Sequence, residues 1–405
     1  MAVEQIKSYL ATLAFSGDFE QLPTSAYLVG GSVRDALLQR YKTPWDLDFV
    51  LPDKAIKTAK EIANHHRAGF VVLDPAREIA RVVLTQGTLD FARQEGDLQT
   101  DLKRRDFTIN AIAYNIQSQQ LVDPLGGLAD LQQGIIRMVS PANLEDDPLR
   151  LLRAYRQAAQ LNFTIEEATK KAIAHRATLL STIAAERVQA ELNYLFTANN
   201  GNRWLGEATN DGLLQFWLPN INRAKIEQLD RVEDAIRFCS DLGLKLPELS
   251  ILSKLATLVS TEAIAAEAEL TQLKYSRAQI KAVTKTVKHL PQLQAMTSPM
   301  SLREQYFWFL DVKDVFPLLM VRAIATDVSL DLLKPLIKRY LDPSDRLVYP
   351  QPLVTGNDLI DRLNLKPSPI IGTLLTEIQI AQIESKIATP QQALDLATTL
   401  LKEGL

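Results

Sequence analysis

The chain has 405 residues, 46% of them hydrophobic, and this length exceeds what a single hydrophobic core usually serves. Its 45 basic and 48 acidic residues give a formal net charge of -3. This balance excludes a general polycation, so any contact with nucleic acid must come from a local basic face. One cysteine, Cys239, and four histidines exclude a disulfide framework and a Cys/His zinc cluster, and they favour a reducing, cytoplasmic setting.

The N-terminal run 1–15, MAVEQIKSYLATLAF, is amphipathic and carries an acidic residue, so we expect no cleaved signal sequence. No apolar run approaches the roughly 20 residues that a membrane span needs. We therefore expect no membrane partner.

Strand-like runs are confined to the first third of the chain, where glycines, prolines and helical stretches separate them. From about residue 140 the pattern changes to helical periodicity. The sequence therefore predicts an α+β fold, with a mixed sheet followed by an all-helical array. The expected strands lie in the runs 26–31, 46–51, 70–74, 79–84, 87–93 and 121–125, and breaks in the helical part fall at 197–202, 291–301 and 341–353.

A diglycine follows the first expected strand, in the stretch YLVGGSVRD. Gly30 and Gly31 allow backbone N–H groups to approach a phosphate closely, and Arg34 can pair with the charge of that phosphate. We expect these three residues to bind a phosphate, the charged part of a nucleotide.

Two carboxylates alternate in the next expected strand, WDLDFV. If this segment is a strand, Asp46 and Asp48 point to the same face, where they repel unless a divalent cation lies between them. Asp oxygens suit Mg²⁺, which favours phosphoryl transfer by the two-metal route, although a solvated acidic face explains the pair as well. Asp90, in the run GTLDFAR, is either a third catalytic carboxylate or one more exposed strand residue.

A charged segment, DLKRRDFTINAIAYN, comes after these strands and reads as a loop that feeds a helix. Asp106 is the expected N-cap of that helix. Further on, Asp147 and Pro148 predict another helix start, after which Arg150, Arg153 and Arg156 recur at every third position. This basic stripe either contacts an anionic ligand or is a solvated helix face.

The order of strand, diglycine, helix and acidic strand over residues 27–52 resembles the signature of polymerase β-like nucleotidyltransferases. Together with the two later motifs, it is similar to the class II tRNA nucleotidyltransferase and bacterial poly(A) polymerase family. The resemblance implies a nucleotidyltransferase head (1–139), a neck that recognises the base (140–200), a helical body (201–296) and a helical tail that binds tRNA (297–405).

The resemblance also implies roles for residues of the later motifs. RRDFTINAIA is similar to the motif in which Arg105 and Asp106 contact the incoming nucleotide, including its ribose hydroxyl. LEDDPLRLLRAYR resembles the motif that reads the base without a nucleic-acid template. This assigns the base to Asp147 and Arg150, and it places Arg153 and Arg156 near the base or the triphosphate. Asp146 stands where the family commonly has Glu.

The expected reaction is addition of the 3′-terminal CCA sequence, or part of it, to tRNA from CTP and ATP, with Mg²⁺ held by Asp46 and Asp48. Between Asp90 and Arg104 the chain is short, whereas relatives that add all of CCA carry a longer mobile loop there. The short segment favours addition of the two cytidines only. An A-adding enzyme, a poly(A) polymerase and a noncatalytic RNA-binding protein are the alternatives, and a monomer is expected.

Overall fold

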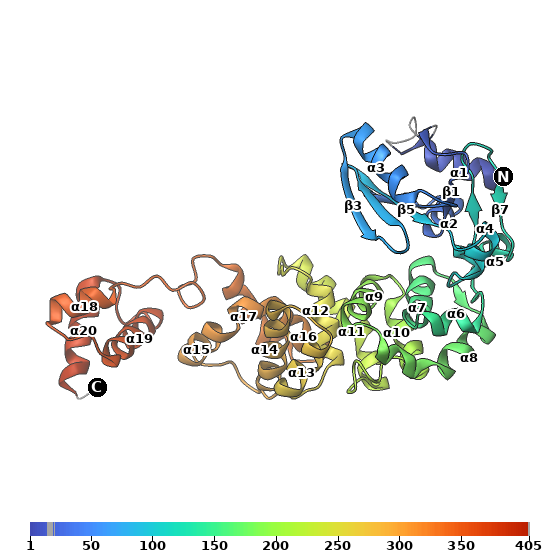
Figure 1. Ribbon diagram of the computed structural model, residues 1–405. Helices are drawn as coiled ribbons and strands as arrows, with labels where there is room; N and C mark the ends of the chain where they lie inside the picture. The colour runs from blue at the N-terminus through green and yellow to red at the C-terminus, as the bar shows by residue number, and fades with distance from the viewer. Residues whose placement is uncertain (14–18, 20, 404–405) are drawn as a thin grey trace. The chain divides into compact units, whose positions relative to one another are not determined.

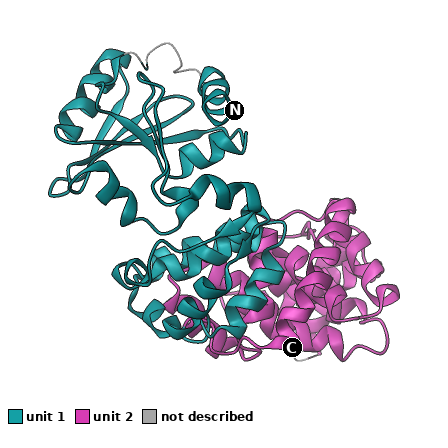
Figure 2. Cartoon of the chain, turned by 90° about the vertical axis from the view of Figure 1, so that its right-hand side faces the viewer, with its two compact units in different colours: residues 1–216 teal, residues 217–405 magenta. Residues whose placement is uncertain are grey.

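The computed structural model describes residues 1–13, 19 and 21–403, with its helices and strands labelled in Figure 1. Residues 14–15 of the N-terminal run and residues 404–405 of the expected tail therefore lie outside the described residues. The chain forms two compact units, Met1–Phe216 and Trp217–Leu405, which Figure 2 shows in teal and magenta. The finer division into head, neck, body and tail stays a prediction.

A seven-stranded sheet organises the first part of unit 1, with the strand order β3-β4-β5-β2-β1-β6-β7. The pairing of β2 with β5 is parallel and all other neighbouring pairs are antiparallel, so the sheet is mixed as predicted. The strands are β1 (Tyr27–Val29), β2 (Trp45–Leu51), β3 (Gly69–Asp74), β4 (Ile79–Val83), β5 (Gly87–Arg93), β6 (Ala113–Tyr114) and β7 (Leu121–Val122).

All six expected strand runs contain a strand. The sequence missed β6 and the separate pair β8 (Ile135–Ile136) and β9 (Thr164–Ile165), because two-residue strands are too short to show an alternating pattern. The helix expected after Asp106 is wrong. That segment forms only a single 3₁₀ turn, η2 (Thr108–Asn110), because the chain enters β6 three residues later.

Helix α3 covers the sheet over β3, β4 and β5, as Figure 1 shows. Beneath it, the rings of Phe49 on β2 and Phe91 on β5 stack at 5.3 Å and are almost fully buried. The helices of unit 1 are α1 (Ala2–Ala11), α2 (Gly31–Leu37), α3 (Ala55–His66), α4 (Leu98–Lys103), α5 (Gly127–Gln133), α6 (Pro141–Asp146), α7 (Leu149–Leu161), α8 (Glu167–His175), η3 (Ala177–Thr182), α9 (Ala185–Thr197) and α10 (Gly201–Asn210).

Helix α7 is the central helix of the second part of unit 1, where it packs against α9 and α10. Leu151, Leu152 and Tyr155 are fully buried, so the side of α7 that carries them faces this helical core. The side chains of the arginines in the basic stripe therefore project from other sides of α7.

Unit 2 is entirely helical in its described residues. Helix α16 is buried along almost its whole length, and Phe316 stacks on Tyr340 at 4.4 Å. The helices of unit 2 are α11 (Arg223–Asp241), α12 (Leu249–Leu258), α13 (Ala263–Gln272), α14 (Arg277–Gln294), α15 (Leu302–Val312), η4 (Lys313–Val315), α16 (Phe316–Ala325), α17 (Leu330–Leu341), α18 (Gly356–Leu363), α19 (Pro369–Ile383) and α20 (Pro390–Lys402).

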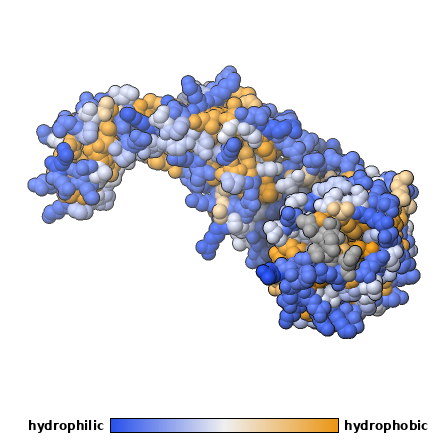
Figure 3. Space-filling model, turned by 90° about the horizontal axis from the view of Figure 1, so that it is seen from above, coloured by the Kyte–Doolittle hydropathy of each residue, from blue (hydrophilic) through white to orange (hydrophobic). Residues whose placement is uncertain are grey.

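The surface is mostly hydrophilic on the face shown in Figure 3, with smaller apolar areas between. Across the described residues, no single helix has the length and apolar character needed to cross a membrane. Helices α12 and α13 reach that length and apolar character only when they are taken together, and the chain bends by 118° between them.

Candidate active site

The turn between β1 and α2 brings the backbone of Gly30 close to charged side chains. Gly30 has a φ of 71°, a left-handed conformation that residues with a Cβ rarely adopt. A Cβ at this position would lie 3.0 Å from Nη1 of Arg105. The N–H of Asp48 donates to Oγ of Ser32 at 3.0 Å, which ties the first turn of α2 to β2.

Asp46 and Asp48 alternate with buried Leu47 and Phe49, so both carboxylates project from one face of β2. Burial, and next the negative charge of Asp46, raises the pKa of Asp48 to about 6. The hydroxyl of Thr88 donates to Asp46, but within the described parts of the chain neither carboxylate forms an ion pair. The positive charges of Arg105 and Arg81 lower the pKa of Asp48, but burial and the charge of Asp46 outweigh them.

Asp90 lies beside Asp48 in the parallel register of β5 and β2. Arg81 of β4 holds Asp90 through two hydrogen bonds of 2.7 Å. Asp90 is therefore the partner of an arginine here, a third possibility beyond the two that the sequence left open. Arg81 would have to withdraw before Asp90 could bind a cation.

The donor set at β2 fits a divalent cation. Among the described residues, no group of three or more His, Cys, Asp or Glu is placed to hold a metal, so the pair has no third ligand of these types. Two carboxylates are what Mg²⁺ commonly takes from a protein when water and phosphate oxygens complete its shell. A cation between them would also remove the repulsion that raises the pKa of Asp48.

Asp106 is 6% exposed and accepts hydrogen bonds on both oxygens. Its Oδ1 accepts from the N–H of Phe107 at 2.8 Å and from Nδ2 of Asn110 at 2.9 Å. Its Oδ2 accepts from Nε and Nη2 of Arg153 at 3.0 and 2.9 Å. A carboxylate has about four lone-pair sites, and these four donors fill them.

The electrostatic state of Asp106 follows from these contacts. Burial favours the neutral acid, yet the charge of Arg153 and the hydrogen bonds from Asn110, Arg153 and Phe107 outweigh it. Together they hold the pKa of Asp106 well below its usual range. Asp106 is therefore ionised in the folded protein and fixes Arg153 of α7 against η2.

Glu191 of α9 holds the two arginines of α7 that follow Arg150. It lies 3.7 Å from Nη1 of Arg153 and forms a close hydrogen-bonded ion pair of 2.5 Å with Nε of Arg156. Arg156 also donates to the side chain of Gln160 at 2.7 Å. The basic stripe is therefore not a freely solvated face, because two of its three arginines pair with acids.

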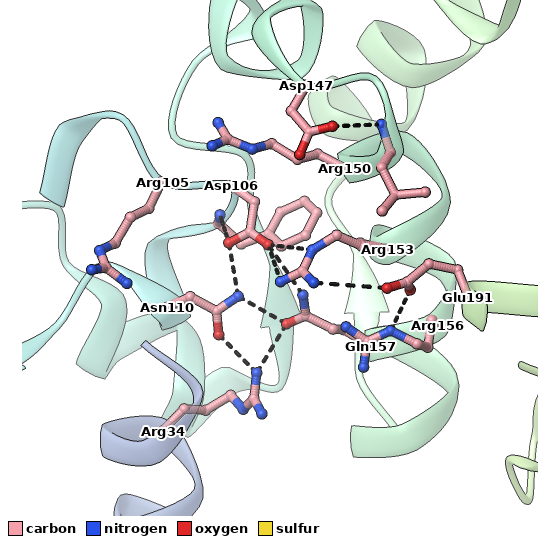
Figure 4. A network of polar contacts seen from close by, with 12 residues as sticks. Arg34, Arg105, Asp106, Asn110, Asp147, Arg150, Arg153, Arg156, Gln157 and Glu191 are labelled. Atoms are coloured by element: carbon pink, nitrogen blue, oxygen red, sulfur yellow. Dashed lines mark hydrogen bonds and ion pairs between the residues drawn. The ribbon is translucent and has the colours of Figure 1, made fainter. Parts of the chain in front are cut away.

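Gln157, which is 1% exposed, connects Arg34 of α2 with Asn110 and Asp106. Its Oε1 accepts from Nη1 of Arg34 at 3.1 Å and from Nδ2 of Asn110 at 3.0 Å, while its Nε2 lies 3.4 Å from Asp106. Arg34 also donates to Oδ1 of Asn110 at 2.7 Å. Figure 4 shows this network from Arg34 to Glu191.

The sequence missed Asn110 and Gln157 as members of the site. Gln157 stands four positions after Arg153, so the helical period places the two on one side of α7. That spacing was the available signal. Asn110 had none, because the 3₁₀ turn that aims it at Arg34 replaced an expected helix.

A pocket of about 310 Å³ opens between these elements. Most of the expected nucleotide-binding residues lie in its wall, and so do both β2 carboxylates. The residues that line it are Tyr9, Gly30, Gly31, Ser32, Arg34, Asp35, Lys42, Pro44, Asp46, Asp48, Arg105, Asp106, Asn110, Arg153 and Arg156.

Asp147 and Arg150, expected to read the base, lie outside the lining of this pocket. Asp147 accepts from Arg187 at 2.9 Å, and Nη1 of Arg150 donates to the carbonyls of Arg104 and Asn143 at 2.7 and 3.0 Å. These bonds use one nitrogen of the Arg150 guanidinium. Figure 4 shows both residues above Asp106 in this view, and its dashed lines join neither of them to the network around Asp106.

Three family descriptions match successive parts of the chain. The poly A polymerase head domain matches residues 26–137, the "Probable RNA and SrmB-binding site of polymerase A" matches 162–225, and the tRNA nucleotidyltransferase domain 2 matches 248–397.

Relatives cover nearly the whole chain. The CC-adding tRNA nucleotidyltransferase of Synechocystis is 47% identical, over 95% of this chain and 96% of its own. The A-adding tRNA nucleotidyltransferase of Deinococcus radiodurans is 31% identical, over 92% and 94%. Among solved structures, a CCA-adding enzyme of Thermotoga maritima complexed with tRNA has a TM-score of 0.74 at 22% identity over 98% of both chains, a likeness of fold.

Proposed function

The chain belongs to the class II tRNA nucleotidyltransferase family, and we propose that it adds the two cytidines of the 3′-terminal CCA sequence to tRNA from CTP. Membership makes it an enzyme that uses CTP or ATP and a divalent metal. The proposal concerns the product, the metal, the location and the residues that act. Mg²⁺ is the proposed metal, and the cytoplasm the proposed location.

The proposed product, two cytidines, is supported by the short connection between β5 and α4. This connection comprises residues 94–97 only, and the N-cap Asp97 accepts from the N–H of Thr100 at 2.8 Å. This is a tight, hydrogen-bonded turn, whereas the longer loop that the family resemblance assigns to CCA-adding enzymes helps the site to switch from C to A. The similarity to the CC-adding protein of Synechocystis supports the same product.

In the proposed reaction the triphosphate lies along the turn at Gly30 and Gly31, with Arg34 pairing its negative charge. Asp46 and Asp48 would hold the divalent cation, which would supply Lewis acidity to the reaction. Arg105, which lines the same pocket, offers further guanidinium donors to the nucleotide. These groups bind and orient the reactants, which is what an in-line displacement requires of a protein.

The ribose and the base are the remaining contacts in the proposal. Because four donors fill Asp106, a ribose 2′-hydroxyl bonds to it only by displacing one of them or by sharing with the weakly placed Gln157. Arg150 keeps its Nε and Nη2 for the acceptors of a cytosine ring, and Asp147 offers an acceptor to the exocyclic amino group.

The product is tested with three tRNA transcripts, one ending at the discriminator nucleotide, one ending in CC and one complete. Each is incubated with CTP and ATP, separately and together, and the added nucleotides are counted on sequencing gels. The first transcript should gain two cytidines from CTP and nothing further when ATP is present. Adenosine on the CC-ended transcript, homopolymer tails on other RNA, or no incorporation at all would each overturn the proposal.

A further inference from the structure

We infer that a second hollow, next to the catalytic pocket, binds the unpaired 3′-terminal nucleotides of the acceptor RNA. It measures about 620 Å³ and lies between the loop after α2 and the C-terminal ends of α7 and α9. The inference rests on the proposed function, because it names where that reaction holds its acceptor strand. This basic hollow is lined by Arg34, Arg40, Lys42, Gln160, Tyr194 and Asn200, among others.

The charge of the basic hollow favours phosphate. It contains the cationic side chains of Arg34, Arg40 and Lys42, and no acidic residue occurs among its described lining residues. Two of these cations, Arg34 and Lys42, form ion pairs with Asp35, which lies in the wall of the catalytic pocket. Three cations against one carboxylate leave the surface positive, and the Lys42 side chain is 55% exposed.

Tyr194 gives the basic hollow a surface on which a base can stack. Tyr194 is 56% exposed, so its ring is accessible to a ligand. The guanidinium of Arg156 lies 5.8 Å from the centroid of that ring. A basic groove that contains an exposed aromatic side chain is how proteins bind single-stranded nucleic acid independently of its sequence.

The basic hollow is continuous with the catalytic pocket. Arg34 and Lys42 line both, and Arg156, which contacts the ring of Tyr194, also lines the catalytic pocket. A strand held on Tyr194 can therefore extend past Lys42 toward Asp46 and Asp48. Released pyrophosphate would also find cations here, but it would gain nothing from an aromatic ring, so Tyr194 favours the RNA strand.

The experiment measures RNA binding at the basic hollow separately from nucleotide transfer. An RNA hairpin that imitates the acceptor stem carries 2-aminopurine as its unpaired 3′-terminal nucleotide, and its fluorescence is titrated with protein in the absence of CTP. The KM values for an unlabelled hairpin and for CTP are measured in parallel. The variants are Tyr194→Ala, Tyr194→Phe and Lys42→Gln. Phe238→Ala, which removes a 37% exposed aromatic side chain of unit 2, is the matched control.

Tyr194→Ala should lower the affinity for the hairpin about tenfold, the usual loss when one stacking side chain is removed. It should also abolish the quenching of 2-aminopurine and leave the KM for CTP unchanged. Tyr194→Phe should keep the quenching, Lys42→Gln should weaken hairpin binding, and Phe238→Ala should change neither readout.

Unchanged quenching in Tyr194→Ala would overturn the inference. So would a Lys42→Gln variant that loses inhibition by inorganic pyrophosphate while its KM for the hairpin stays constant. A wild-type protein that binds the hairpin but adds no cytidine would refute the proposed function instead, so the two failures can be told apart.

Discussion

Arg153→Met tests whether the pair formed by Asp106 and Arg153 holds η2 against α7. The change removes two charge-assisted hydrogen bonds to a carboxylate that is 6% exposed, and it removes a weaker ion pair of 3.7 Å with Glu191. Breaking a fully buried ion pair from one side costs about 3–5 kcal/mol. The Arg153 side chain is 34% exposed, so water screens part of the interaction and we expect about 2–3 kcal/mol.

The sign of the pH dependence follows from the lowered pKa of Asp106. Because the folded-state pKa lies below the unfolded value of about 4, the stabilising contribution is fully present above that value and is lost as the pH falls below it. The difference between wild type and Arg153→Met should therefore be constant between pH 6 and 8 and should shrink in acid.

Hydrogen exchange read by mass spectrometry measures this locally, on peptides from residues 104–110 and from α7. Arg187→Met, which breaks an ion pair whose arginine is 50% exposed, is the control and should cost no more than about 1 kcal/mol. The double variant Asp106→Asn/Arg153→Met should be more protected than Arg153→Met alone. Additive losses, within about 0.5 kcal/mol, would refute the claim that the two side chains are coupled.

Three further predictions concern the nucleotide site. Mg²⁺ should raise the unfolding temperature more at pH 7.5 than at pH 5, because the pKa of Asp48 is about 6 and the pair repels fully only above it; equal shifts in calorimetry would contradict this. Gly30→Ala should raise the KM for CTP at least about tenfold in steady-state assays, since φ is 71° and the new Cβ would lie 3.0 Å from Nη1 of Arg105; Gly243→Ala, whose φ of 85° brings similar backbone strain but whose Cβ would meet open space, is the control. Gln157→Leu should raise the KM for CTP, because Gln157 accepts a hydrogen bond from Arg34 of the nucleotide pocket, whereas Gln189→Leu on α9 should leave that KM unchanged.

The sequence predicted the parts of the fold that local pattern controls. The alternation in WDLDFVL identified β2 and the common face of Asp46 and Asp48, because the period of a strand is fixed by its backbone geometry. The order of strand, diglycine and helix likewise predicted the turn at Gly30. The change from strands to helices after the first third followed from hydrophobic periodicity.

Pairings between distant segments were not predictable in this way. Arg81 binds Asp90 because β4 and β5 are neighbours in register, and Arg153 binds Asp106 because α7 packs near η2. Which acid meets which arginine depends on tertiary packing that no single stretch of sequence encodes. The role of Gln157 as a shared acceptor arises from the same packing.

The measurement that tests the account most directly is incorporation of labelled CTP into tRNA by Asp46→Ala and Asp48→Ala, with binding of the same tRNA measured in parallel. We predict that both variants bind tRNA like the wild type and keep its unfolding temperature within a few degrees, yet transfer no cytidine at any Mg²⁺ concentration. Turnover retained by either variant would contradict the assignment of the β2 carboxylate pair as the reactive centre.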